Sequence, residues 1–539
     1  MENTKINTYL GQKGYTIPKN EINVETQKQI RNDLSIKPVS HGAPSGGNSQ
    51  VSFPAYRESS NKFYVPHYYG AAKFGAPKEY KISEGDNIDL DFAGTLRDGQ
   101  IPVVETYINH VKKVGVGGGL LELPCAYGKT VLSLNIISRL NKKTFIIVHK
   151  EFLMNQWIER IQQFLPKARI GKIQGPIVDI DDKDIVIGML QSLSMKEYPV
   201  SLFDSFGLTI IDEVHHISSE VFSNTLFKLV TKYMLGLSAT MNRKDGTTHV
   251  FKMFLGDVIF KGKRDEERKV TVRAIEYQVD DDEFNDVKLD YRGNVAYSTM
   301  ISKLCEYNRR SEFILKILAD MFQENPSQQI MVLAHNKNIL KYIHDAIKHR
   351  NIATVGYYVG GMKEQALKET ESKQVVIATY AMAAEALDIK SLTTLIMATP
   401  KTDIEQSVGR ILREKHSSPI VVDIVDSHST FKNQWRKRKT FYKKENYKII
   451  YTTSPEYNPD TSLTSWTVVF NPVSKDCKPI KNDKNDKNDK NDKKNISVKS
   501  NSSSDKSITS DSDDDFEEEV EEGPKDKYLT GVCFLKFKK

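Results

Sequence analysis

Short, predominantly apolar runs alternate with helical patterns along most of this 539-residue chain. In the first half, the runs cover residues 144–148, 184–190, 208–211 and 233–237, and polar residues follow each of them. A strand that is apolar throughout is covered on both faces, as in a parallel sheet flanked by helices. The alternation therefore predicts an open parallel α/β sheet, in which ligands gather at the carboxyl ends of the strands.

A second series of the same kind follows a charged run at 261–269. Its expected strands are 329–334, 353–359, 374–379, 394–398 and 420–425, and a basic, aromatic helix pattern at 431–447 comes after them. A chain of this length is too long for one core, and a charged run is typical of a connection between domains. We therefore expect two α/β domains of similar layout, although their sequences do not visibly repeat.

The segment 117–134, GGGLLELPCAYGKTVLSL, is typical of an apolar strand, a small-residue loop and an amphipathic helix. Such a loop at a helix N-terminus binds phosphate through backbone N–H groups and the helix dipole. Lys129 would reach the β- and γ-phosphates, and the Thr130 hydroxyl would hold Mg²⁺. Taken alone, the segment also fits an ordinary strand–turn–helix, so the partner motifs must decide.

The match of this segment to the P-loop consensus is partial. Leu123 replaces the first glycine, and Ala126 fills a position that glycine often occupies. We expect residues 117–119 to be a flexible lead into the strand rather than a second phosphate cradle. The loop residues expected to contact ATP are Pro124, Cys125, Ala126, Tyr127 and Gly128.

Acidic and hydroxyl side chains follow two of the expected strands. Asp212 and Glu213 come directly after the strand 208–211, which is the Walker B arrangement. Asp212 would hold Mg²⁺ and Glu213 would polarise the attacking water. Ser238-Ala239-Thr240 follows the next strand and could link the nucleotide to the other domain; alone it would be a loop.

Two further polar groups complete the candidate ATP site. Arg97 and Gln100 precede a helix pattern at 101–114, and a glutamine amide can both donate to and accept from the adenine edge. Gln406, Arg410 and Arg413 lie at i, i+4 and i+7, on one face of an expected helix. Arginines there could stabilise charge on a transferring phosphoryl group. The alternative for each group is an exposed surface helix.

The charge and composition limit the class of protein. The formal net charge of +7 is compatible with polyanion binding. The cysteines lie far apart in sequence, which favours reduced thiols in an intracellular protein; they are Cys125, Cys305, Cys477 and Cys533. No apolar run approaches the roughly 20 residues of a membrane helix, so we expect a soluble protein.

Taken in order, the segments PCAYGKT, TFIIVHK, IGMLQSL, IIDEVHH, LGLSATMNRKDG, IATYAMAAEALDI and QSVGRILR resemble the motifs of superfamily 2 helicases. The DExH box at 212–215 and the RKDG after Ser-Ala-Thr are similar to the branch that holds the XPB repair helicase and poxvirus-type transcript-release helicases. The resemblance spans residues 64–447. It implies two tandem RecA-like parallel-sheet domains.

With that resemblance, the expected organisation has five parts. They are a disordered extension (1–60), a small N-terminal module (61–95), RecA-like domain 1 with the ATP site (96–262), RecA-like domain 2 (263–448) and a low-complexity tail (449–539), which holds the repeat KNDKNDKNDKND and an acidic run at 511–522.

The resemblance also implies residue roles. Gln100, with Arg97, reads adenine; Lys129 and Thr130 bind phosphate and Mg²⁺; Asp212 and Glu213 serve metal and catalysis. The residues implied to couple ATP to nucleic acid are His215, Ser238, Thr240, Thr379, Glu385 and Asp388. Gln406, Arg410 and Arg413 complete the ATP site, with Arg413 as the arginine finger.

The implied function is an ATP- and Mg²⁺-dependent helicase or translocase that contacts nucleic-acid backbones. Duplex DNA is the favoured substrate and RNA the alternative, with a role in transcription or repair and contacts to transcription machinery through the N-terminal module or tail. A nucleotide-gated clamp without turnover is the rival function. The Asn/Lys-rich tail and the resemblance suggest a large DNA virus, hence a location in the host cytoplasm that could include packaging in the virion. Candidate contacts to phosphates are Lys150, Arg243, Lys244 and Lys337.

Overall fold

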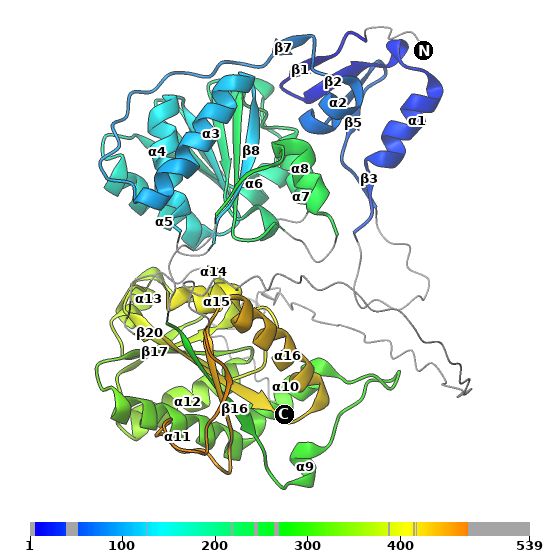
Figure 1. Cartoon of the computed structure of the whole chain (residues 1–539). Coiled ribbons are helices and arrows are strands. Elements are labelled where there is room, and N and C mark those ends of the chain that lie inside the picture. Colours follow the sequence, from blue (N-terminus) through cyan, green and yellow to red (C-terminus); the bar gives the residue numbers. More distant parts are fainter. Residues whose placement is uncertain are drawn as a thin grey trace, which may run out of the picture. The chain divides into compact units, whose positions relative to one another are not determined.

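The computed structural model describes residues 6–38, 52–124, 127–216, 219–241, 246–262, 269–385, 389–412, 416 and 418–472. These residues form an N-terminal module (6–81), lobe 1 (82–262) and lobe 2 (269–472) (Figure 1). None of the described helices has the length and apolar character needed to cross a membrane.

The N-terminal module is a five-stranded sheet with two helices. Its strand order is β5-β6-β2-β1-β7, with bounds β1 (Tyr9–Gly11), β2 (Gly14–Pro18), β5 (Arg57–Glu58), β6 (Lys62–Val65) and β7 (Glu79–Lys81). The helices are α1 (Val24–Asp33) and α2 (His67–Phe74), and a separate pair is formed by β3 (Ser35–Ile36) and β4 (Phe53–Pro54). Asn23 caps α1 by accepting a hydrogen bond from the Thr26 N–H at 2.7 Å.

The expectation that residues 1–60 lack packed structure is wrong for the described part of that segment. β2 pairs with β6, about 50 residues later, and β1 pairs with β7, about 70 residues later. These pairings bury Leu10, Tyr15 and Ile17, which are too few and too scattered to stand out in the polar sequence. The strands form because of partners far along the chain, which local composition does not indicate.

Lobe 1 contains the first of the two predicted α/β sheets. Its strand order is β11-β10-β12-β9-β13-β14-β8-β15, and within the described residues every pair is parallel except β10 with β11. The strands are β8 (Gly117–Glu122), β9 (Thr144–Val148), β10 (Ile170–Gln174), β11 (Ile177–Asp179), β12 (Ile185–Met189), β13 (Leu208–Ile211), β14 (Tyr233–Ser238) and β15 (Val258–Lys261).

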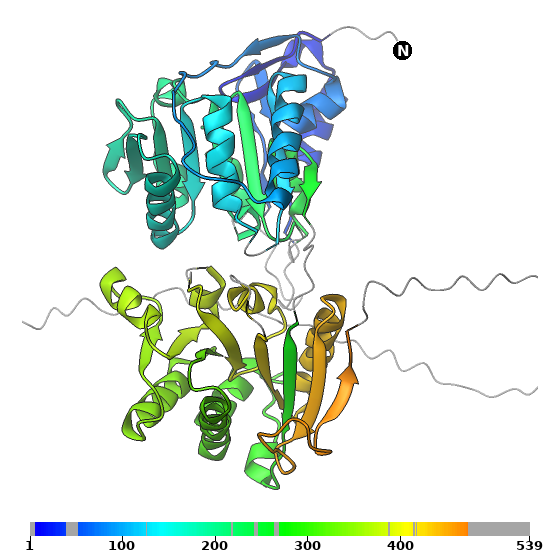
Figure 2. The ribbon, with the colours of Figure 1, turned by 60° about the vertical axis from the view of Figure 1, so that its left-hand side comes forward.

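Helices cover both faces of this sheet (Figure 2). Along β9, Ile146 and Val148 pack with α3 (Ile101–Val114), α4 (Lys129–Leu140) and α5 (Glu151–Phe164). Phe145 and Ile147 point to the other face, whose helices are α6 (Leu190–Met195), α7 (Ser219–Leu226) and α8 (Thr248–Leu255). This coverage of both faces explains why the strand is apolar throughout.

The glycine run 117–119 is part of β8, so the expected flexible lead into the strand is wrong. A Cβ on Gly118 would lie 2.6 Å from the Met234 carbonyl oxygen, and one on Gly119 would lie 2.7 Å from Ile259. Neighbouring elements approach this part of the strand so closely that only glycine fits there.

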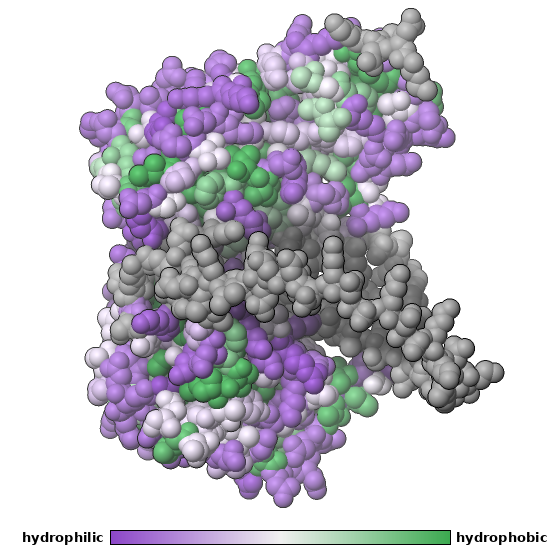
Figure 3. Space-filling model, in the orientation of Figure 1, coloured by the Kyte–Doolittle hydropathy of each residue, from purple (hydrophilic) through white to green (hydrophobic). Residues whose placement is uncertain are grey.

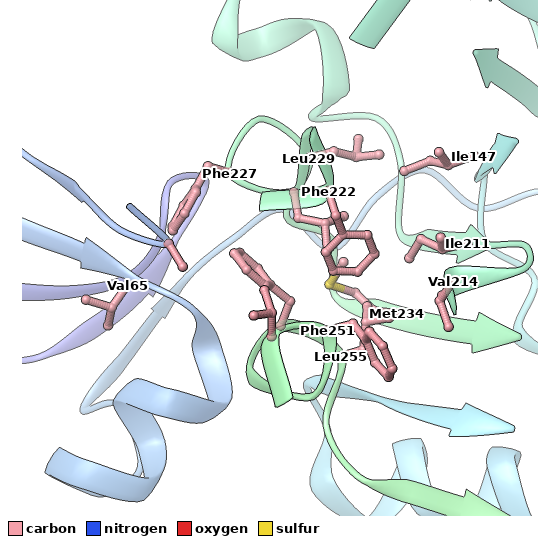
Figure 4. Packing of buried hydrophobic residues seen from close by; sticks show 14 of the residues in the cluster. Val65, Ile147, Ile211, Val214, Phe222, Phe227, Leu229, Met234, Phe251 and Leu255 are labelled. Carbon is pink, nitrogen blue, oxygen red and sulfur yellow. The ribbon is translucent and has the colours of Figure 1, made fainter. Parts of the chain in front are cut away.

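The N-terminal module packs on the α7–α8 side of lobe 1. Val65 of the module shares a cluster with Phe222, Phe227 and Phe251 of the lobe (Figure 4). The Tyr68 hydroxyl also accepts a hydrogen bond from the Gly118 N–H at 2.6 Å. The module and lobe 1 therefore share one hydrophobic core.

Lobe 2 contains the second predicted sheet, in the order β18-β19-β17-β20-β21-β16-β22-β23. Its strands are β16 (Thr271–Tyr277), β17 (Gln329–Ala334), β18 (Val355–Tyr358), β19 (Val375–Thr379), β20 (Leu392–Met397), β21 (Ile420–Asp426), β22 (Lys448–Thr453) and β23 (Thr467–Phe470). Its helices are α9 (Asp282–Asn285), α10 (Tyr297–Glu306), α11 (Asn308–Glu324), α12 (Lys337–His349), α13 (Glu364–Glu371), α14 (Tyr380–Glu385), α15 (Glu405–Arg410) and α16 (Ser429–Lys444).

The sheet of lobe 2 extends beyond the expected domain end at 448. β22 runs parallel to β16 and buries Ile449 and Ile450, and β23 adds an antiparallel edge strand. The expected tail 449–539 therefore starts too early. The KND repeat and the acidic run lie outside the described residues.

Candidate active site

Three loops meet at the carboxyl edge of the lobe 1 sheet. β8 leads into the phosphate loop and α4, and its neighbour β14 ends at Ser238, which pairs with Glu122 of β8. β13 lies on the other side of β14 and leads directly into Asp212. Parallel register therefore brings the phosphate loop, the acidic pair and the Ser-Ala-Thr turn to one edge, as the sequence predicts.

The phosphate-loop lysine contacts the acidic pair. Lys129 Nζ forms an ion pair with Glu213 Oε1, and both side chains are largely buried. Glu213 has φ 48°, in the left-handed region that residues with a Cβ seldom occupy. Such backbone conformations cost of order 1–3 kcal/mol and cluster at functional sites. Here the conformation turns the Glu213 side chain back toward the loop.

Asp212 is held through both carboxylate oxygens. The indole Nε1–H of Trp157 donates to Oδ2 at 2.9 Å, and the Glu213 N–H donates to Oδ1 at 3.0 Å. Burial, followed by the nearby negative charge of Glu213, raises the pKa of Asp212, and Lys129 and the Trp157 hydrogen bond oppose that rise. The carboxylate is therefore fixed in orientation before any ligand binds.

Trp157 is a site residue that sequence reasoning missed. In the sequence it looks like any other apolar residue of a helical pattern, and it is 1% exposed on α5. A buried tryptophan nearly always needs an acceptor for its indole N–H. That requirement was the available signal, but the acceptor lies 55 residues away on another element.

A polar chain continues from the acidic pair to the Ser-Ala-Thr turn. His215 Nδ1 lies 3.4 Å from Glu213 Oε2 and 2.6 Å from Ser238 Oγ. The Thr240 N–H donates to Ser238 Oγ at 3.2 Å. The structure thus brings together His215, Ser238 and Thr240, the predicted coupling residues of lobe 1.

Arg97 and Gln100 lie against the phosphate loop. Gln100 Nε2 and Arg97 Nη2 donate to the Tyr127 carbonyl oxygen at 2.8 and 2.5 Å. Gly128 has φ 90°, and a Cβ there would lie 2.5 Å from Gln100 Nε2. Position 128 therefore requires glycine.

The remaining loop positions are only partly described. Thr130 lies in the first turn of α4, and the Pro124 carbonyl oxygen accepts a hydrogen bond from the Tyr127 N–H at 3.2 Å. Cys125 and Ala126 fall outside the described residues.

The predicted site residues of lobe 2 lie at the carboxyl edge of its own sheet. Thr379 ends β19, and its hydroxyl accepts a hydrogen bond from the Met382 N–H at 3.4 Å, near the start of α14. Arg410 is buried, and its Nε–H donates to the Ala383 carbonyl oxygen at 2.6 Å. The guanidinium therefore joins α15 to α14.

Four expectations for lobe 2 are changed or left open. α15 carries Gln406 but ends at Arg410, so the prediction of one helix reaching position 413 is wrong. Glycine at position 409, with low helix propensity, precedes this early end. Arg413 and Asp388 lie outside the described residues, and the Glu385 side chain is not described.

The predicted phosphate contacts are also partly described. Lys150 is the N-cap residue of α5, after β9, and Lys337 is exposed at the start of α12, after β17. Both therefore lie at the carboxyl edge of a sheet. Arg243 and Lys244 fall outside the described residues.

Comparisons with known proteins agree with this geometry. Residues 93–243, which contain the phosphate loop and the acidic pair, match the family model described as "Type III restriction enzyme, res subunit". The chain is 35% identical over 457 residues to "Putative ATP-dependent RNA helicase L396" of Acanthamoeba polyphaga mimivirus, which covers 82% of this chain and 86% of that protein.

Two more distant relatives also come from large DNA viruses. "Putative ATP-dependent RNA helicase QP509L" of African swine fever virus is 27% identical, covering 66% of this chain and 74% of that protein. "Putative helicase 161L" of Invertebrate iridescent virus 6 is 25% identical, covering 80% and 98%. The chain belongs to the superfamily 2 helicases and is an ATP-dependent helicase.

Proposed function

We propose that this helicase hydrolyses ATP at the carboxyl edge of lobe 1 and couples hydrolysis to movement along a nucleic-acid backbone. The observation that carries the proposal is the contact of Lys129 with Glu213 beside the buried Asp212. A phosphate-binding lysine, a fixed carboxylate and a second acid are the groups that phosphoryl transfer to water requires.

Before ATP binds, the Lys129–Glu213 ion pair holds the site in a resting state in which Glu213 is not available to the attacking water. The γ-phosphate of bound ATP would compete for the Lys129 ammonium group, because a phosphate carries more negative charge than one carboxylate. Glu213 would then be released to orient and polarise the attacking water. Formation of the catalytic arrangement would thus depend on ATP binding.

The residues present fit a magnesium ion. Mg²⁺ takes oxygen ligands, and it is usually held by one or two protein groups together with phosphates and water. Asp212 offers a buried, oriented carboxylate, and Thr130 offers a hydroxyl in the first turn of α4. Within the described ranges no group of three His, Cys, Asp or Glu residues forms a metal site, which suits an ion bound mainly through its nucleotide. When bound, Mg²⁺ would neutralise charge on the phosphates.

The proposed link from ATP to nucleic acid runs through His215, Ser238 and Thr240. His215 Nδ1 lies 3.4 Å from Glu213 Oε2, and hydrogen bonds join His215 and Thr240 to Ser238 at the end of β14. A shift of Glu213 on ATP binding would therefore move the residues of this turn. In lobe 2, Thr379, Arg410 and Gln406 are the described residues proposed to respond.

Two substrates have separate support. The motifs resemble those of the XPB-like and poxvirus-type branch, which favours duplex DNA and a role in viral transcription or repair. The names of two relatives, from mimivirus and African swine fever virus, favour RNA. Stimulation of ATP turnover by matched single-stranded DNA, duplex DNA and RNA distinguishes the two.

The proposed chemistry is tested by Glu213→Gln. The amide keeps the size of the side chain but cannot serve as a base, so ATP binding should persist while turnover falls by about 10²-fold or more. Glu220→Gln is the matched control, because Glu220 is an exposed acid in the first turn of α7. Unchanged turnover in Glu213→Gln would refute the assigned role. Wild-type protein that binds nucleic acid and ATP without turnover would instead support a clamp.

A further inference from the structure

Helix α16 of lobe 2 is unusually basic. Seven of its 16 residues are Lys or Arg, and none is Asp or Glu. The predicted roles in ATP and nucleic-acid binding do not include any of them. Figure 1 shows α16 as a long helix of lobe 2, and Figure 3 shows hydrophilic residues interspersed with more apolar ones on the visible surface of this lobe.

The inward face of α16 fixes the helix firmly to the sheet. Arg438 is 1% exposed, and its Nε and Nη2 donate to the two carboxylate oxygens of Asp423 at 2.8 Å each. The Tyr442 hydroxyl donates to the same carboxylate at 2.9 Å. Phe431 and Trp435 are buried beside them. A bidentate buried ion pair restricts both partners, so the helix presents its outer face in a fixed orientation.

One side of α16, here called its outward face, is a ridge of positive charge in which Arg436 and Lys443 are exposed and Lys432 and Lys439 are half-buried. Lys432, Arg436, Lys439 and Lys443 lie at i, i+4, i+7 and i+11, which is one side of a helix. Lys432 pairs with Glu276 at 3.0 Å. Among the described residues, no carboxylate forms an ion pair with Arg436, Lys439 or Lys443.

The dimensions of this ridge match a polynucleotide. From Lys432 to Lys443 the helix rises about 16 Å, at 1.5 Å per residue. One strand of duplex DNA carries a phosphate about every 3.4 Å along its axis, so the ridge spans about five phosphates. None of the exposed large apolar side chains of the described chain lies on α16, so the face offers little to a partner that docks by apolar contact.

We propose that the outward face of α16 is a binding site for the phosphate backbone of the nucleic acid on which the helicase acts. The site rests on the proposed function, because it presumes a nucleic-acid substrate. Its recognition is electrostatic and independent of base sequence. α16 would hold the strand on lobe 2 in addition to the contacts expected at Lys150 and Lys337.

The test removes the three cations that lack a carboxylate partner. The full chain with Arg436→Gln, Lys439→Gln and Lys443→Gln is compared with wild type for binding of a fluorescein-labelled 20-base-pair DNA duplex and its RNA counterpart. The matched control removes three exposed cations elsewhere on lobe 2, with Lys341→Gln, Lys348→Gln and Lys363→Gln. All six side chains are outside the proposed ATP site, so ATP binding without nucleic acid should be unchanged.

The expected loss of affinity for nucleic acid is large and depends on the salt concentration. Three phosphate contacts account for about 2.7 in the slope of log K against log salt, and for a loss on the order of 100-fold in affinity at 0.15 M salt. The control should retain the wild-type slope. Equal losses in both variants would overturn the proposal by showing a general effect of net charge.

Unchanged affinity in the α16 variant, with wild-type binding intact, would also overturn it. That outcome would leave a protein partner or the chain's own acidic run at 511–522 as the occupant of the face. Failure of the wild type to bind either nucleic acid would refute the proposed function itself, so the two failures are distinguishable.

Discussion

The hydrogen bond from Trp157 to Asp212 supplies a quantitative test of how the site is held. Trp157→Phe keeps a buried aromatic ring but removes the indole N–H that lies 2.9 Å from Asp212 Oδ2. A hydrogen bond to a charged group contributes about 1.5–3 kcal/mol, and the smaller ring adds a packing loss of about 1 kcal/mol. The free energy of unfolding of lobe 1 should therefore fall by about 2.5–4 kcal/mol.

A double-mutant cycle separates the hydrogen bond from the packing loss. Trp157→Phe is combined with Asp212→Ala, and the free energies of unfolding of the four proteins are measured by urea denaturation. The coupling energy should be about 1.5–3 kcal/mol, because the cycle cancels what each substitution does alone. Trp435→Phe is the control for packing, since Trp435 is buried and has no carboxylate hydrogen bond among the described contacts. A coupling energy below about 0.5 kcal/mol would refute the reasoning, because that is the usual error of additivity.

Three other predictions follow from buried groups and backbone geometry. Arg438→Met leaves the Asp423 carboxylate buried without its cation and should destabilise lobe 2 by about 3–5 kcal/mol in urea unfolding. Burial lowers the pKa of His67 to about 4, so between about pH 6.5 and 4 only the unfolded chain binds a proton at this residue. The melting temperature should therefore fall as the pH drops through that window, and His67→Gln should reduce the fall. Gly128→Ala forces a side chain into the left-handed region and onto Gln100, so the Kd for a fluorescent ATP analogue should rise at least about tenfold, a cost within the range for backbone strain.

Matched controls make each of these results interpretable. Arg436→Met changes an exposed arginine of the same helix and should leave stability within about 0.5 kcal/mol. Gly360→Ala adds a methyl group where nothing lies within 4 Å, and it should leave nucleotide affinity unchanged. A His67→Gln protein with the wild-type pH profile would contradict the assignment to His67, and an Arg438→Met protein as stable as wild type would contradict the anchoring of α16.

The strands of both lobes could be predicted from sequence because their signal is local. A buried parallel strand is apolar at nearly every position, as at Thr144–Val148 and Leu208–Ile211, where the predicted and observed bounds agree. The residues that follow such strands then share an edge, which placed Asp212 and Ser238 correctly beside the phosphate loop.

The features that could not be predicted depend on distant partners. The N-terminal strands exist because β2 and β6 pair across a long separation. The glycines of β8 are required by neighbours that approach from β14 and β15. Trp157 looks like any other apolar helix residue until its acceptor is known. In each case the controlling contact lies between elements that the sequence does not place next to each other.

The proposed function requires that lobe 1 hydrolyses ATP in a reaction coupled to nucleic acid. The direct test is the steady-state ATPase rate of the full chain in the presence of Mg²⁺, alone and with saturating single-stranded DNA, duplex DNA or RNA of equal length. We expect a higher kcat with at least one of these polymers and loss of that increase in Glu213→Gln. An ATPase rate that none of the three polymers changes, in protein that binds both ATP and nucleic acid, would contradict it.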